Sequence, residues 1–187
     1  MNLTFANKLT IGRILSVPFF IASLMYYTPE HDYLRYCALG IFLIAIITDV
    51  IDGYVARVHH QKSTAGAILD PLADKFLLIS AFVCLHTVKE ITVYPFYVPI
   101  AVLLVVISRD VILLIGSTII YLVNGKIDIV PTKWGKATTF FQVVAIVGIL
   151  LRLPIFPVAW QAACFVTIIS GLGYIRNGIK VLNATAH

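Results

Sequence analysis

Long apolar runs separated by short polar segments are the feature that most limits how this chain can fold. A run of about 18 or more apolar residues is long enough to cross the hydrocarbon core of a bilayer, and this chain contains several. Of its 187 residues, 60% are hydrophobic and 12% are charged, whereas about a quarter of the residues in soluble domains are charged. So much apolar surface cannot all be buried in one core, which predicts an integral membrane protein.

The apolar runs predict an all-α integral membrane protein with six transmembrane helices, forming a single domain over residues 1–187. We expect the helices at roughly Thr10–Tyr27, Leu34–Ala56, Leu72–Val88, Pro95–Val123, Thr138–Leu151 and Ile155–Leu182. The first run is long for the apolar part of a secretory signal, and no small-residue cleavage site follows it. We therefore expect it to be retained as the first helix.

The distribution of basic residues predicts the orientation of these helices. Six spans put both termini on one side, and that side carries Lys8, Arg13, Arg57, Lys62, Lys75, Lys126, Lys133, Lys136, Arg176 and Lys180. The opposite side carries Arg35, Lys89 and Arg152. Because lysine and arginine concentrate in cytoplasmic loops, we expect both termini in the cytoplasm. Basic residues in short loops suit lipid headgroups and phosphorylated substrates, and we expect no nucleic-acid partner.

Four aspartates lie at the facing ends of the second and third predicted helices. Asp49 and Asp52 are three residues apart, and Asp70 and Asp74 are four residues apart, so each pair shares a helix face. A short loop joins the two helices, and an antiparallel turn would bring all four carboxylates together. An acidic residue inside an apolar helix costs about 2.5–3.5 kcal/mol on translocon scales, so the cluster indicates a functional site.

Two kinds of site would explain four adjacent carboxylates. One is the cation or proton pathway of a transporter, and the other is a cluster that binds hard cations such as Mg²⁺, Mn²⁺ or Ca²⁺. The aspartates gather at one membrane face rather than near its midplane, where transporters bind their substrates. The residues beside them also favour the metal site. Gly53 and Ala56 form a small, open helix face that ends at Arg57, whose charge suits a phosphate-bearing substrate, although Arg57 taken alone fits a membrane anchor better.

The two aspartate pairs belong to a longer pattern, which reads Asp49-x-x-Asp52-Gly53-x-x-Ala56-Arg57, eight residues, Gly66, three residues, Asp70, three residues, Asp74. This pattern resembles the full signature of the CDP-alcohol phosphatidyltransferase family, with all eight fixed positions at the family spacing. The resemblance implies a six-helix membrane enzyme, typically a homodimer. Such enzymes transfer a phosphatidyl or similar group from a CDP-linked donor to an alcohol and release CMP.

The same resemblance implies roles for individual residues. Two divalent cations, Mg²⁺ or Mn²⁺, would lie among the aspartates: Asp49 and Asp70 would contact both ions, Asp52 would complete the first site and Asp74 the second. Asp74 would also act as the general base toward the acceptor hydroxyl. The positions that match donor-binding residues of the family are Asn7, Thr10, Gly53, Ala56, Arg57, Ser63 and Gly66.

Basic residues on the cytoplasmic side predict a pocket for a phosphate on the acceptor. The candidates are Arg109, Lys133, Lys136 and Arg176. For Arg109 we favour this role because an arginine in lipid is costly; the alternatives are a structural pair with Asp110 and, for the lysines, an ordinary interfacial position.

Three short sequence elements indicate which alcohol is the acceptor: Asn-x-Leu-Thr-x-x-Arg near the N-terminus, Ser108-Arg109-Asp110, and the segment from Pro131 to Thr138. They resemble the bacterial phosphatidylglycerophosphate synthases, which implies CDP-diacylglycerol and sn-glycerol 3-phosphate as substrates at the inner membrane, with the site facing the cytoplasm. Cardiolipin synthase, which uses phosphatidylglycerol, is the alternative within the family, and inositol-phosphate and serine transferases fit less well. A cation or proton transporter is the alternative from another class.

Overall fold

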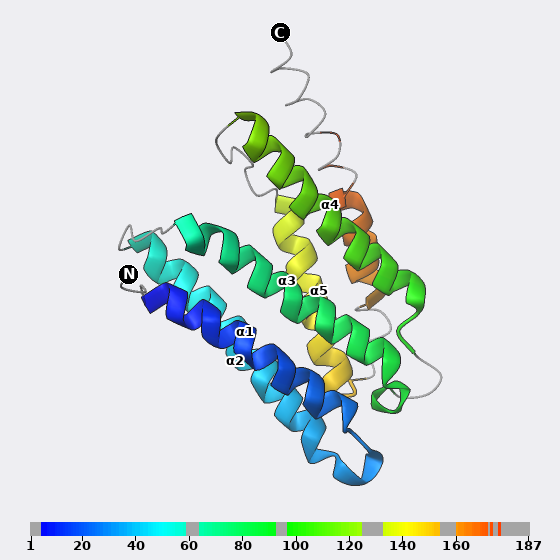
Figure 1. Cartoon of the computed structure of the whole chain (residues 1–187). Helices are drawn as coiled ribbons and strands as arrows, with labels where there is room; N and C mark the ends of the chain where they lie inside the picture. Colours follow the sequence, from blue (N-terminus) through cyan, green and yellow to red (C-terminus); the bar gives the residue numbers. More distant parts are fainter. Residues whose placement is uncertain are drawn as a thin grey trace. The chain divides into compact units, whose positions relative to one another are not determined.

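The computed structural model describes residues 5–58, 64–92, 97–124, 133–153 and 160–171, with residues 173 and 176. Within these ranges the chain is helical and contains no strand, which confirms the all-α prediction for this part (Figure 1). The α-helices are α1 (Phe5–Met25), α2 (Tyr33–Val58), α3 (Thr64–Thr87), α4 (Ile100–Asn124) and α5 (Lys133–Leu150). Two short 3-10 helices, η1 (Pro29–His31) and η2 (Lys89–Ile91), and a helical segment over Trp160–Gly171 complete the described elements.

The helices group into two compact units. The first contains α1, α2, α3 and the residues Ile149–Arg152. The second contains α4, most of α5 and the segment Trp160–Gly171. Judged by length and hydropathy, Tyr33–Ile51 is the one helix in the described ranges that could cross a membrane. Four shorter apolar helices of 10–17 residues accompany it: Leu9–Met25, Lys75–Thr87, Gly135–Leu150 and Trp160–Gly171.

The boundaries of two helices differ from the sequence prediction in ways that affect the candidate residues. Helix α3 begins at Thr64 rather than Leu72, so Gly66 and Asp70 lie within it. Helix α5 begins at Lys133 rather than Thr138. The prediction began the two helices after Pro71 and after the lysines at 133 and 136, whereas the helical backbone continues through these residues.

The core of the first unit forms along α1, which packs against both α2 and α3 (Figure 1). Its buried positions are separated alternately by three and four residues, the spacing of one helix face: Thr10, Arg13, Val17, Phe20 and Leu24. Helix α2 repeats this spacing with Arg35, Ala38, Phe42 and Ala45. The rings of Phe20 and Phe42 meet where these faces touch, with centroids 5.9 Å apart. Ile11, Leu15 and Phe19, on other faces of α1, are exposed.

Helix α5 ends in a turn that places an arginine in an unusual backbone conformation. Arg152 has a φ of 53°, a left-handed value that costs a side-chain-bearing residue about 1–2 kcal/mol. The amide of Arg152 donates to the carbonyl of Ile149 at 2.9 Å, and that of Leu153 donates to Gly148 at 2.9 Å. These two bonds form a Schellman motif, in which the left-handed position is usually glycine.

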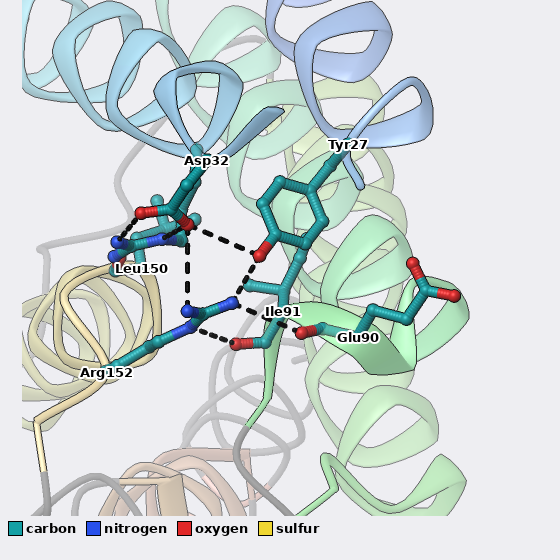
Figure 2. A network of polar contacts seen from close by, with 7 residues as sticks. Tyr27, Asp32, Glu90, Ile91, Leu150 and Arg152 are labelled. Atoms are coloured by element: carbon teal, nitrogen blue, oxygen red, sulfur yellow. Dashed lines mark hydrogen bonds and ion pairs between the residues drawn. The ribbon is translucent and has the colours of Figure 1, made fainter. Parts of the chain in front are cut away.

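The side chain of Arg152 explains why an arginine occupies this position. It joins a polar network, the Asp32 network, that links the α1–α2 connection, η2 and the end of α5 (Figure 2). Arg152 donates to the carbonyls of Ile91 at 3.3 Å and Glu90 at 3.4 Å and to the hydroxyl of Tyr27. Its Nη1 lies 3.6 Å from Oδ1 of Asp32. One side chain thus connects three chain segments that are distant in sequence.

The carboxylate of Asp32 is the acceptor shared by Arg35 and Arg152 in the Asp32 network. It accepts hydrogen bonds from Nε of Arg35 at 2.9 Å and from Nη2 of Arg35 at 2.7 Å, while Arg35 also donates to the carbonyl of Leu150. The hydrogen bonds from Arg35 are the main cause that lowers the pKa of Asp32 to about 2. The carboxylate is therefore ionised throughout the physiological pH range, and the ion pairs persist there.

We predict that Arg152→Met lowers the free energy of unfolding by about 1–3 kcal/mol, because the partners of a charged donor lose their hydrogen bonds. Arg152→Gly should lose about 1 kcal/mol less, because glycine adopts a positive φ without strain. Unfolding of detergent-solubilised protein measures both effects. Lys89→Met, at an exposed lysine next to Glu90, is the matched control. Equal stability of the Arg152→Met and Lys89→Met proteins would contradict the prediction.

Candidate active site

The four aspartates lie in the parts of α2 and α3 that are closest along the chain. Asp49 and Asp52 belong to the last part of α2, which ends at Val58, and Asp70 and Asp74 belong to the first half of α3, which begins at Thr64. At 3.6 residues per turn, each position is within about three turns of the helix end that faces the connection. The side chains of Asp52, Asp70 and Asp74 lie outside the described part of the structure.

Asp49 is the aspartate whose surroundings the structure describes. Oδ1 of Asp49 lies 2.9 Å from Nη1 of Arg13, which reaches it from α1. The arginine side chain is 1% exposed and that of the aspartate is 36% exposed. Asp49 also continues the buried spacing of α2, four residues after Ala45. It therefore lies at the edge of the α1–α2 contact, with one side paired and the other open.

The register of α3 relates its two aspartates to the core. Asp70 and Asp74 each lie seven residues before a buried residue, Leu77 and Ala81 respectively. Positions seven residues apart share a helix face. The spacing therefore puts both aspartate positions in line with the face of α3 that is buried within the first unit.

The chemistry of this donor set fits a hard divalent cation. Carboxylate oxygens are the ligands that Mg²⁺ and Mn²⁺ prefer, and the open side of Asp49 leaves an oxygen-bearing group accessible. Among the residues with described side chains, no group of three or more His, Cys, Asp or Glu lies close enough together to bind a metal ion.

The predicted donor-binding residues fall on three elements. Asn7 and Thr10 belong to α1, and Thr10 is buried one turn from Arg13 on the same face. Gly53, Ala56 and Arg57 lie in α2 and Gly66 in α3. The structure describes only the backbone for this set apart from Thr10, and Ser63 lies outside the described residues.

Arg109, the leading acceptor candidate, lies in α4 within the second unit. Its Nη1 donates to Oδ1 of Asp110 at 2.7 Å, and its Nη2 donates to Oγ of Ser170 at 3.1 Å. The arginine is 7% exposed and the aspartate is fully buried. The alternative considered from the sequence, a structural pair between Arg109 and Asp110, is therefore present. The Nε of Arg109 is buried and has no hydrogen-bond partner among the described residues.

The other acceptor candidates lie in different surroundings. Lys136, in the first turn of α5, and Arg176 are exposed, while the side chain of Lys133 lies outside the described part. Of the acceptor candidates with described side chains, Arg109 is therefore buried, and Lys136 and Arg176 are exposed.

Sequence reasoning missed two of the contacts around these residues. It assigned no role to Ser170, which holds Arg109, or to the pairing of Arg13 with Asp49. Ser170 and Arg13 are polar residues within apolar runs, and Arg13 also belongs to the N-terminal Asn-x-Leu-Thr-x-x-Arg element. Their partners lie 61 and 36 residues away, so spacing could not identify them.

Comparison with known proteins identifies the family. The model of the CDP-alcohol phosphatidyltransferase family matches residues 3–171. A probable phosphatidylglycerophosphate synthase of Mycobacterium tuberculosis is 34% identical over 181 residues, which cover 94% of this chain and 81% of that protein. A CDP-diacylglycerol–glycerol-3-phosphate 3-phosphatidyltransferase of Blochmanniella floridana is 34% identical over 145 residues, or 78% of this chain and 72% of that protein.

A relative that is named for a different activity also matches. A cardiolipin synthase (CMP-forming) / mitochondrial hydrolase fusion protein of Schizosaccharomyces pombe is 33% identical over 171 residues, which cover 82% of this chain and 26% of that protein. This chain therefore belongs to the CDP-alcohol phosphatidyltransferase family and is a phosphatidyltransferase of phospholipid biosynthesis.

Proposed function

We propose that this enzyme transfers the phosphatidyl group of CDP-diacylglycerol to sn-glycerol 3-phosphate and produces phosphatidylglycerol phosphate and CMP. The observation that carries the proposal is that relatives named for this synthesis match most of the chain, including 94% of it in the M. tuberculosis protein. The aspartate pattern from Asp49 to Asp74 supports the same chemistry.

The reaction requires one proton acceptor and a means of stabilising charge on the diphosphate. The acceptor hydroxyl attacks the phosphorus of the phosphatidyl group, a new P–O bond forms, and the bond from that phosphorus to the bridging oxygen breaks. CMP leaves with the bonding electron pair, and Asp74 takes the hydroxyl proton as general base. Asp74 has this role in the proposal because its position matches that of the family's base.

Asp49, Asp52, Asp70 and Asp74 would hold two divalent cations, Mg²⁺ or Mn²⁺. When bound, such ions neutralise the diphosphate and stabilise the leaving oxygen. Asn7, Thr10, Gly53, Ala56, Arg57, Ser63 and Gly66 would bind the donor. The pairing of Asp49 with Arg13, one turn from buried Thr10, supports a donor site near the first metal ligand.

Arg109 would bind the phosphate of the acceptor, with Lys133, Lys136 and Arg176 contributing positive charge. The buried Nε of Arg109 supports this role, because it lacks a hydrogen-bond partner among the described residues. Its bonds to Asp110 and Ser170 would orient the guanidinium.

Cardiolipin synthesis is the second candidate within the family, and the match to the S. pombe fusion protein supports it. Its acceptor, phosphatidylglycerol, carries a phosphodiester in place of a phosphomonoester. A transporter, the alternative from another class, does not explain the match of the family model to residues 3–171.

We propose six membrane-spanning helices, cytoplasmic termini, an active site that faces the cytoplasm of the inner membrane, and a homodimer. The Asp32 network supports the topology, because Asp32, Arg35 and Arg152 come from segments that the basic-residue distribution predicts on one membrane face. The exposed apolar side chains of α2 support contact with lipid; they include Leu43, Ile44, Ile47, Val50 and Ile51.

Release of CMP tests the proposed reaction. Purified protein is supplied with CDP-diacylglycerol, Mg²⁺ or Mn²⁺, and one acceptor at a time: glycerol 3-phosphate, phosphatidylglycerol, serine or inositol phosphate. We expect the fastest release with glycerol 3-phosphate, and chelation of the cation should abolish it. Fastest release with phosphatidylglycerol would favour the second candidate, and no release with any acceptor would overturn the proposal.

Asp74→Asn tests the general base. We expect donor binding to persist and turnover to fall by about 10²–10⁴-fold, the contribution typical of a positioned base. Glu90→Gln, at an exposed acid in η2, controls for loss of one carboxylate and should retain wild-type turnover. Near-normal turnover of the Asp74→Asn protein would remove Asp74 from this role.

Arg109→Ala and Lys136→Ala test the acceptor site. Loss of a hydrogen bond to a charged group costs about 1.5–3 kcal/mol, which corresponds to an increase of roughly 10–100-fold in the acceptor KM for Arg109→Ala. Lys136→Ala should give a smaller increase because this lysine is exposed. Both proteins should still bind CDP-diacylglycerol, and Lys89→Ala is the control. An unchanged acceptor KM in both proteins would refute the assignment.

A further inference from the structure

We propose that Arg13 is a positioning residue that fixes the carboxylate of Asp49 in the orientation needed to bind a divalent cation. The inference rests on the metal site of the proposed function. The observation behind it is the contact of 2.9 Å between Nη1 of Arg13 and Oδ1 of Asp49, which joins α1 to α2.

The burial of Arg13 makes this contact a constraint on Asp49. An arginine that is 1% exposed cannot exchange its partner for water, and removal of one member of a buried ion pair leaves an uncompensated charge. Surface ion pairs, in contrast, exchange readily with solvent and contribute little. The guanidinium is planar and its donors point in fixed directions, so it restricts the orientation of the carboxylate that it contacts.

The exposure of Asp49 leaves room for a second partner. A carboxylate has two oxygens with about four acceptor sites, and one contact with Arg13 does not exhaust them. With 36% of its side chain exposed, Asp49 is held on its buried side and remains open on the other. Carboxylates that bind metals are commonly oriented by such hydrogen bonds from neighbouring groups.

The packing of α1 explains why the positioning group comes from this helix. Helix α1 packs against both α2 and α3 (Figure 1), the two helices that carry the four aspartates. Arg13 occupies the buried face of α1 together with Thr10 and Val17. A residue on that face is held by the core of the first unit, so the position of Asp49 depends on the packing of α1.

Direct binding of the donor diphosphate is the competing role for Arg13, and the geometry disfavours it. A side chain that is 1% exposed, compared with 7% for Arg109, leaves almost no surface for a substrate to contact. The two roles also predict different measurements, because a positioning residue affects the affinity for the cation before any donor is present.

The affinity for Mn²⁺, measured without substrate, separates these roles. Free Mn²⁺ is quantified by electron paramagnetic resonance during titration of detergent-solubilised wild-type, Arg13→Met, Arg13→Lys and Arg35→Met proteins. The last is the matched control, since it removes an equally buried arginine from another aspartate pair, Arg35–Asp32, in the same unit. Circular dichroism and the elution volume in size-exclusion chromatography establish that each protein is folded.

We expect Arg13→Met to raise the Kd for Mn²⁺ by about 10–100-fold, as loss of a group that orients a ligand typically does. Arg13→Lys should give an intermediate Kd, because an ammonium group keeps the charge but not the directed donors. Arg35→Met should retain the wild-type Kd. If Arg13→Met does not fold, Arg13→Lys decides the question, and a wild-type Kd in that protein overturns the inference.

Three other outcomes would also overturn it. One is a wild-type Kd for Mn²⁺ in Arg13→Met together with weaker binding of CDP-diacylglycerol, which would make Arg13 a donor ligand. Another is no change in either affinity, which would make the ion pair purely structural. The third is an equal rise in Arg35→Met, which would reflect general loss of stability. Failure of the wild-type protein to bind Mn²⁺ would instead refute the metal site, and Mn²⁺ binding without CMP release would refute only the transferase reaction.

Discussion

A charge buried among apolar helices needs a partner of opposite sign, and this requirement organises the described parts of the molecule. Three arginines with little exposed surface each contact an aspartate, and the pairs are Arg13–Asp49, Arg35–Asp32 and Arg109–Asp110. An unpaired charge in such surroundings is strongly destabilising. Of these, the Arg13–Asp49 pair joins two helices, so it restricts which positions of α1 and α2 can meet, whereas the other two pairs join residues one and three positions apart.

In the first unit, the Arg13–Asp49 pair lies at the candidate site. The same face of α1 supplies apolar side chains along most of its length and Arg13 near its beginning. Apolar contacts align α1 with α2 and α3, and the ion pair relates one aspartate to that alignment. The Asp32 network ties together the segments that follow α1 and α3 and the end of α5. We infer that packing and charge pairing together hold the helices that carry the aspartate pattern of this phosphatidyltransferase.

Much of this arrangement was predictable, and the differences have physical causes. Hydropathy located the helices because apolar length is a local property, but it placed the start of α3 at Leu72 instead of Thr64. The error arose because Asp70 and Pro71, which precede Leu72, indicated a helix boundary, whereas α3 continues through both positions. The aspartate spacing and the family pattern followed from residue identity alone, and the family match agrees with them. Pairing such as Ser170 with Arg109 was not predictable, because the two residues are 61 positions apart.

The sequence by itself determined the all-α class, the membership of the family and the periodic spacing of the four aspartates. These properties depend on local composition and on the fixed geometry of a helical turn. The tertiary structure decided that α1 packs on both α2 and α3, that Arg13 meets Asp49, and that Arg152 occupies a left-handed turn that its side chain helps to hold. Those features depend on which helix faces meet, and that choice is made by the packing of many side chains together with the need to pair every buried charge.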